Sequence, residues 1–125
     1  MWPRDGALVA RALDRPGYND VTRVIYQFCA TTITREGYFP HKYRPDGTQG
    51  SSWHPWVLGG KRQFPIQEDE TALVLWALWR HFTTYRHVEL LKPLYRPLIV
   101  RAANFMLRYR DEHTGLPLPS YDLWE

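Results

Sequence analysis

The chain has 125 residues, of which 44% are hydrophobic and 15% aromatic, enough apolar material for one packed domain. Sixteen basic and thirteen acidic residues give a net charge of +3 without a run of like charges, so nucleic acid is not an expected partner. The single cysteine excludes an internal disulfide framework and a zinc site built on several cysteines.

The longest uninterrupted apolar run covers residues 72–79 and is far shorter than the roughly 20 residues that cross a bilayer. No membrane partner is therefore expected. The opening Met-Trp-Pro-Arg-Asp-Gly lacks the basic-then-apolar order of a signal peptide. Nothing in these residues directs export, and the cellular compartment stays open.

Two helices are predicted in the first third of the chain. The first spans about residues 5–14, with Asp5 as its N-cap and Pro16-Gly17 as its stop. The second begins near Asn19-Asp20 and ends before Gly37. Its apolar residues follow the spacing of one buried helical stripe, formed by Val21, Val24, Ile25, Phe28, Cys29 and Thr32.

Residues 37–66 carry many prolines and glycines, which predicts a long loop with at most short strands. A loop of this length in a compact domain is usually functional. Asp46-Gly47 within it is typical of a turn. A third helix is expected over residues 68–85, and its apolar middle predicts that other helices surround it.

A fourth helix is predicted over residues 97–112, starting at Pro97 and burying Leu98, Ala102, Phe105, Met106 and Tyr109. Residues 88–95 are either a lead-in turn or an earlier, kinked part of the same helix. The order of helices without βαβ alternation predicts an all-α domain of helical hairpins. Different burial of the helices suggests an inner and an outer layer.

Three segments combine tryptophan with carboxylates: residues 2–5, the stretch from 51–56 to 66–70, and residues 120–125. Each lies at, or leads into, the start of an odd-numbered helix, if a fifth helix follows. Stacked hairpins bring equivalent loops to the same end, so these clusters are expected to converge there. The alternative is that each acid is a helix cap and each tryptophan a core residue.

These segments also carry a resemblance. Trp-Pro-Arg-Asp-Gly, Gly-Ser-Ser-Trp-His-Pro-Trp, Gln-Glu-Asp-Glu-Thr-Ala-Leu and above all Pro-Ser-Tyr-Asp-Leu-Trp-Glu resemble the bacterial glucoamylase branch of glycoside hydrolase family 15, over essentially the whole chain. The resemblance implies a partial (α/α)6 barrel, with residues 1–125 supplying about the first third of its hairpins. It implies an inverting enzyme that releases glucose from the non-reducing ends of starch-like α-glucans.

By this resemblance Glu125 is the general acid, and Arg4 and Asp5 hold the terminal glucose. An inverting glycosidase needs a second carboxylate that activates water, roughly 6.5–9.5 Å from the acid. No residue of this chain corresponds to it, so turnover by these residues alone is not expected. The candidate catalytic residue is Glu125, and the candidate substrate-binding residues are Trp2, Arg4, Asp5, Trp53, Trp56, Gln67, Asp69, Tyr121, Asp122, Leu123 and Trp124.

The five histidines lack the spacing of a zinc site, so no metal or other cofactor is expected. His81 and His87 are interpreted as surface residues, and Lys42 as a solvated lysine. Glucodextranase, trehalase, a glucoamylase-like domain that binds without cleaving, and a helical-repeat interaction module remain alternatives. An α-glucan or oligosaccharide is the expected partner, and self-association through an exposed apolar flank is also expected.

Overall fold

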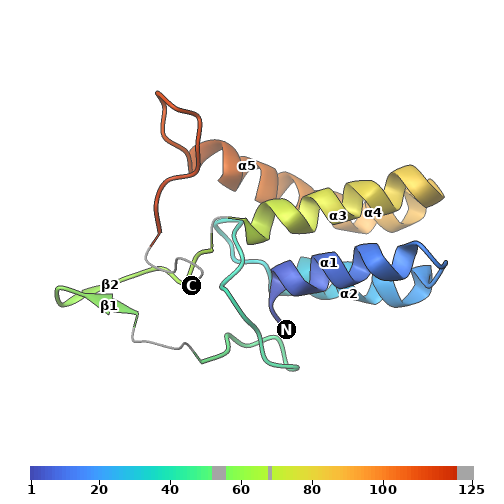
Figure 1. Cartoon of the computed structure of the whole chain (residues 1–125), viewed down its shortest axis with the longest axis horizontal. Coiled ribbons are helices and arrows are strands. Elements are labelled where there is room, and N and C mark those ends of the chain that lie inside the picture. Colours follow the sequence, from blue (N-terminus) through green and yellow to red (C-terminus); the bar gives the residue numbers. More distant parts are fainter. Residues whose placement is uncertain (52–55, 68, 121–125) are drawn as a thin grey trace.

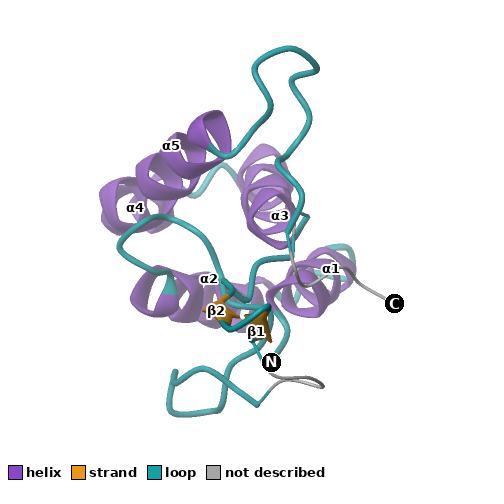
Figure 2. Ribbon diagram, turned by 90° about the vertical axis from the view of Figure 1, so that its left-hand side faces the viewer, coloured by secondary structure: helices purple, strands orange, loops and turns teal. Residues whose placement is uncertain are grey.

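The computed structural model describes residues 1–51, 56–67 and 69–120. These residues are mostly helical, as the sequence predicts, and form two helical hairpins that lie side by side (Figures 1 and 2). The first hairpin consists of α1 (Pro3–Asp14) and α2 (Asn19–Thr32). The second consists of α3 (Glu70–Tyr85) and a continuous run of α4 (Val88–Leu94), the π-helical η1 (Tyr95–Val100) and α5 (Arg101–Arg108).

The helices form two layers, visible in the end-on view of Figure 2: α1 and α3 lie in one layer, and α2 and the α4–η1–α5 run lie in the other. Helix α1 packs most extensively against α3, and α2 contacts α4 and η1. Figure 1 shows that α1 and α3 run in the same direction, so their first residues lie at the same end of the layer. This parallel arrangement brings together side chains that are more than 60 residues apart in sequence.

Helix α1 begins two residues earlier than predicted. Its first residue is Pro3, and the N-cap position belongs to Trp2, not to Asp5. Proline suits this position because its fixed φ is already helical and its missing N–H would have no partner in the first turn. Asp5 instead lies within the first turn, where the helix dipole favours a carboxylate.

Helix α2 turns only part of its predicted stripe to the core: Cys29 is buried, and Ile25 and Phe28 pack against the core. Val21 and Val24 are 51% and 62% exposed, whereas Thr22, Tyr26 and Cys29 are buried. The reason is that Thr22 donates a buried hydrogen bond to Asp14 of α1, which fixes the rotation of α2 about its axis. The orientation that exposes the two valines is thus the one that allows this polar contact between helices.

Helix α3 starts at Glu70, and Glu68 lies outside the described residues. Val74, Ala77 and Leu78 are buried, but Trp76 and Trp79 are 43% and 59% exposed. The prediction of a helix covered on every side is therefore wrong for these residues. The contacts of α3 with α1, α2 and α5 leave one of its faces uncovered.

The last helical run extends over residues 88–108, so the earlier-helix interpretation of 88–95 is confirmed and the predicted start at residue 97 is wrong. Pro97 lies inside the run and has no N–H to donate to the carbonyl of Pro93, four residues earlier. The widened turns of η1 surround this gap. Leu98 and Ala102 are buried as predicted, but Met106 is 38% exposed.

The loop between the hairpins contains the short antiparallel strands β1 (Val57–Leu58) and β2 (Lys61–Arg62). Gly59 and Gly60 join them with φ of 56° and 75°, a conformation that glycine adopts without a steric penalty. Farther along, Pro40 pairs with Ile66, which ties the beginning of the loop to its end. Short strands in a long loop agree with the prediction.

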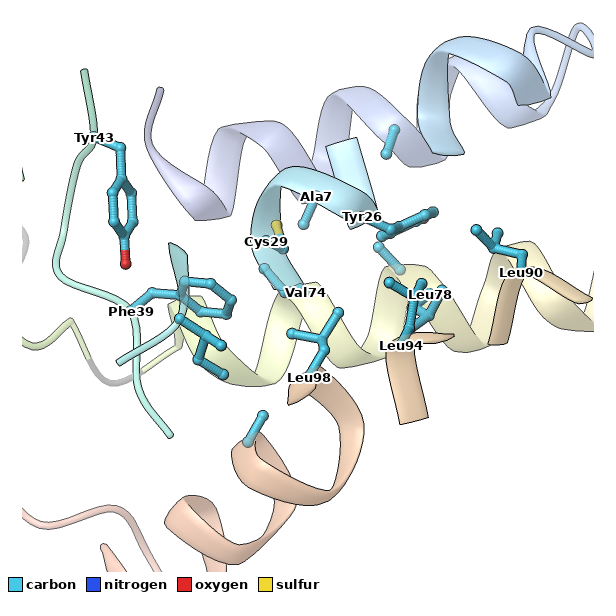
Figure 3. Packing of buried hydrophobic residues seen from close by; sticks show 14 residues of the cluster. Ala7, Tyr26, Cys29, Phe39, Tyr43, Val74, Leu78, Leu90, Leu94 and Leu98 are labelled. Atoms are coloured by element: carbon cyan, nitrogen blue, oxygen red, sulfur yellow. The ribbon is translucent and has the colours of Figure 1, made fainter. Parts of the chain in front are cut away.

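The core lies between the two hairpins, and Figure 3 shows its buried side chains. Tyr26, Leu98 and Val74 come from different helices and are at most 1% exposed. Cys29 is also buried, as predicted, and desolvation by burial, aided by the charge of Glu70, raises its pKa to about 12. The thiol is therefore protonated at neutral pH and packs as a small apolar group.

His81 is fully buried, so the prediction of a surface residue is wrong. Its Nδ1 lies 2.9 Å from Oδ1 of Asp14, whose side chain is also fully buried. Thr22 donates to the same carboxylate at 2.8 Å. His87 is half-buried, with its ring 5.8 Å from that of His81. The sequence pattern missed this polar cluster because its members lie far apart along the chain.

Over the described ranges, none of the helices combines the length and apolar character that a membrane span requires.

Candidate functional site

The structure brings three predicted site residues together where α1 and α3 begin. Arg4, in the first turn of α1, donates from Nη2 to Oε1 of Gln67 at 2.6 Å. Its Nη1 lies 3.5 Å from Oδ2 of Asp69, the residue immediately before α3. We call Arg4, Gln67 and Asp69 the Arg4 cluster. It joins the starts of two parallel helices across 63 residues of sequence.

The Arg4 cluster is held firmly but remains open to solvent. Gln67 is 4% exposed, whereas the side chains of Arg4 and Asp69 are 19% and 48% exposed. The planar guanidinium carries five N–H donors in a fixed plane, so partners on two of its nitrogens orient the whole group. Donors and acceptors presented at an accessible edge are suited to binding the hydroxyl groups of a polar ligand.

Asp5 lies beside this cluster in sequence but is exposed on the first turn of α1. The described carboxylate that meets Arg4 is therefore Asp69, not Asp5. Because Asp69 belongs to the segment before α3, the pairing links the two helices instead of two neighbours on one helix. Asp5 keeps its carboxylate available at the same end of α1.

Trp2 stands next to the cluster at the N-cap of α1. The ammonium group of Lys42 lies 5.2 Å from the centroid of its ring, a distance typical of a cation–π contact. The neighbouring Tyr43 accepts from the N-terminal amine of Met1 at 2.7 Å and donates its backbone N–H to the carbonyl of Met1 at 2.8 Å. The loop residues 42–43 thus fix the position of Trp2.

Trp56 lies on a different part of the loop. Its half-buried ring is 5.2 Å from the ring of His41, which is fully buried. His41 donates its backbone N–H to the carbonyl of Pro65 at 3.0 Å, just before Ile66 and Gln67. Trp56 is thus connected to the Arg4 cluster through His41 and the end of the loop.

Six predicted site residues lie outside the described part of the chain: Trp53, Tyr121, Asp122, Leu123, Trp124 and the candidate acid Glu125. The described residue that precedes five of them is Ser120. Its hydroxyl donates to the carbonyl of Ile66 at 2.5 Å. Ser120 is therefore bonded to the residue that precedes Gln67.

Sequence reasoning missed the contacts of Lys42 and Ser120. Lys42 carries no motif, and its contact with Trp2 depends on how the loop folds back on the start of α1. Ser120 was part of a recognisable segment, but its role depends on a carbonyl 54 residues away. A hydrogen bond to a backbone carbonyl does not depend on the acceptor's residue type, so no sequence motif predicts it.

Two hollows beside α3 lie away from the Arg4 cluster. One, of about 430 Å³, lies between α3, α5 and residues 109–117. The other, of about 280 Å³, is an apolar groove between α3 and the α4–η1 run.

Among the residues with described positions, no three His, Cys, Asp or Glu side chains are grouped so as to hold a metal ion. The cluster itself, with one guanidinium, one amide and one carboxylate, suits a neutral polar ligand better than a cation.

Comparison with known proteins finds a distant similarity. Over all 125 residues the chain is 26% identical to a protein of Methanocaldococcus jannaschii named as an uncharacterized glycosyl hydrolase. The chain spans 18% of the length of that relative. No protein-family model matches the chain, and no solved structure matches it. The chain is thus distantly similar to a protein named as a glycosyl hydrolase.

Proposed function

We propose that this chain is part of the catalytic domain of a glycoside hydrolase, an inverting exo-acting α-glucosidase of glucoamylase type. Its substrate is a starch-like α-glucan or an oligosaccharide, from which glucose is released at the non-reducing end. The distant similarity to a protein named as a glycosyl hydrolase supports the general class. The sequence motifs around Arg4 and Glu125 support the finer assignment.

The observation that carries the proposal is the hydrogen bond between Arg4 and Gln67. The two residues come from two of the three tryptophan-and-carboxylate segments, and the bond holds these segments at one end of the helical layer. Ser120 attaches the third segment to the neighbouring Ile66. Contacts of Arg4 with Gln67 and of Ser120 with Ile66 support the proposal, because a shared sugar pocket requires these segments to lie near one another.

In this proposal the residues divide the work of binding and catalysis. Arg4 donates to hydroxyl groups of the terminal glucose, Asp5 accepts from them, and Trp2 stands beside the ring. Glu125 protonates the leaving oxygen. Tyr121, Asp122, Leu123 and Trp124 form the pocket wall, and Trp53 and Trp56 border the next sugar.

The resemblance to glycoside hydrolase family 15 implies that Gln67 and Asp69 border the second sugar. Their contacts with Arg4 support a different role, in which both residues orient the guanidinium toward the first sugar. Asp69, with a half-exposed side chain, is still able to meet a ligand. Gln67 is too buried to contribute much more than its hydrogen bond to Arg4.

The layered hairpins support a partial (α/α)6 barrel in which residues 1–125 supply the first hairpins. In such a barrel, a further hairpin would pack into the apolar groove between α3 and α4–η1. Self-association through this groove belongs to the same proposal. Its lining residues are Leu75, Leu78, Trp79, Phe82, Leu91, Tyr95 and Ile99.

Binding calorimetry of the chain with maltose, isomaltose, trehalose and cellobiose tests the proposal without requiring turnover. We expect binding of at least one α-linked disaccharide and none of the β-linked cellobiose. The preferred disaccharide separates glucoamylase, glucodextranase and trehalase specificities. Arg4→Met should weaken binding by at least about tenfold, because hydrogen bonds from a charged donor are stronger than neutral ones.

Arg15→Met is the matched control, since Arg15 follows the last residue of the same helix and is exposed there. It removes the same charge far from the Arg4 cluster and should leave binding unchanged. Equal affinity for cellobiose, or equal loss in the two arginine variants, would contradict the proposal.

A further inference from the structure

Lys42 lies where the long loop folds back on the start of α1. The next residue, Tyr43, exchanges two hydrogen bonds with Met1: its N–H donates to the Met1 carbonyl at 2.8 Å, and its carbonyl accepts from the N-terminal amine at 2.7 Å. The Tyr43 hydroxyl donates to the carbonyl of Thr32, the last residue of α2, at 3.0 Å. The backbone of Lys42 is therefore anchored at the start of α1.

Gly50 lies opposite this lysine, across the turn formed by residues 44–49. Its N–H donates to the carbonyl of Lys42 at 2.8 Å, and the flanking residues Tyr43 and Gln49 are paired. A Cβ at position 50 would lie 2.7 Å from Cγ of Lys42 and 3.2 Å from both Cδ and Cε. Carbon atoms pack at about 3.5–4.0 Å. The Lys42 stem therefore occupies the space that a side chain at position 50 would need.

The backbone conformation at position 50 does not itself require glycine. The φ of Gly50 is not positive, whereas the φ of the nearby Gly47 is 83°. Alanine would therefore suit the backbone at position 50, but its methyl group would displace the stem of Lys42. The feature that glycine provides here is room for the lysine.

The charged end of Lys42 lies against the ring of Trp2. Its ammonium nitrogen is 5.2 Å from the ring centroid, within the range in which an aromatic face attracts a cation. This contact restrains the indole ring two residues before Arg4. An aromatic ring that is already held in its binding orientation loses less conformational entropy when a ligand packs against it.

We propose that Lys42, seated over Gly50, is a positioning residue that holds the indole ring of Trp2 in the orientation in which it packs against a bound sugar. This role rests on the proposed function, because it assumes that the sugar bound by Arg4 also contacts Trp2. Lys42 acts through the indole ring. Gly50 belongs to the same arrangement, because it leaves room for the lysine stem.

Lys42→Met tests the charge, because methionine keeps much of the stem and lacks the ammonium group. Calorimetry should show that this variant binds maltose about 2- to 5-fold more weakly, the factor that corresponds to one partly exposed cation–π contact. Lys42→Arg retains the cation and should restore most of the affinity. The matched control is Lys92→Met, which removes an exposed charge from α4 and should leave maltose binding unchanged.

Gly50→Ala tests the seat of the lysine. The added methyl group should displace the stem, so the affinity for maltose should fall about as far as in Lys42→Met. In a Lys42→Ala background there is no long stem to displace, and Gly50→Ala should cause no further loss. NMR gives a readout without ligand: the Trp2 ring should shift the ε-methylene protons of Lys42 upfield in the wild-type chain, and Gly50→Ala should abolish this shift.

Trp2→Leu separates positioning of the indole from a general effect on the loop. If Lys42 acts through the ring, Lys42→Met should not weaken maltose binding further in the Trp2→Leu background. A further loss there, equal affinity of wild type and Lys42→Met, or no upfield shift in the wild type overturns the role of Lys42 and leaves the proposed function standing. If the wild-type chain binds none of the α-linked disaccharides, the proposed function is overturned, and the role of Lys42 with it.

Discussion

Replacing Asp14 with alanine should lower the free energy of unfolding by about 1–3 kcal/mol or more, because the buried side chain of His81 loses its hydrogen bond to the Asp14 carboxylate. The side chains of Asp14 and His81 are 0% and 1% exposed, so water cannot replace the lost contact. Thr22 also loses its acceptor in α1. The cluster joins α1, α2 and α3, so its loss should loosen both hairpins.

Urea unfolding followed by circular dichroism measures this effect. The matched control is Glu89→Ala, which breaks the exposed contact between Glu89 and Lys92 at 2.6 Å and should hardly move the unfolding midpoint. The double variant with Asp14→Ala and His81→Ala should lose less than the sum of the single variants, because the two residues are coupled. Equal midpoints for Asp14→Ala and Glu89→Ala would show that the buried pair does not stabilise the fold.

Gly37→Ala should destabilise the protein by about 3 kcal/mol or more, from two causes that add. Gly37 has φ of 102°, where a side chain adds about 1–3 kcal/mol of strain. A Cβ there would also lie 2.2 Å from the carbonyl oxygen of Arg101, and such overpacking costs about 1–3 kcal/mol. The contact lies between the end of the first hairpin and the start of α5, and backbone atoms on both sides leave little room to adjust.

Gly17→Ala separates the two causes. Gly17 has a similar φ of 98°, but a Cβ there would meet nothing within 4 Å. It should therefore show the strain without the overpacking and unfold at a clearly higher urea concentration than Gly37→Ala. If both alanine variants unfold at the same midpoint, the close approach of Arg101 to Gly37 is not maintained in solution.

Much of the fold follows from local patterns. Proline and glycine positions predict the C-terminal end of α1 and the long loop, and apolar spacing predicts the existence of the helices. The rotation of α2 could not be predicted this way, since it depends on the bond between Thr22 and Asp14. The burial of His81 is hidden for the same reason. Both errors arise from polar groups that pair across helices and therefore escape an analysis of hydrophobic periodicity.

The candidate site shows a similar division. The sequence predicts that residues around Arg4 and Gln67 converge, because parallel helices of successive hairpins begin at the same end, and the structure places these two residues in contact. It does not predict that Asp69 is the carboxylate that meets Arg4. The contact with Asp69 depends on the path of the loop before α3.

The most direct test of a sugar site at the start of α1 and α3 is an NMR titration of the wild-type chain with maltose. We expect the Arg4 Nε–H and the Trp2 indole N–H to shift, with nuclear Overhauser contacts between these side chains and the non-reducing glucose ring. The indole of Trp79, which is exposed on the α3–α4 groove, should stay unchanged. Shifts confined to Trp79, or a bound ring without contact to Trp2 and Arg4, would contradict a saccharide site at this end of the helices.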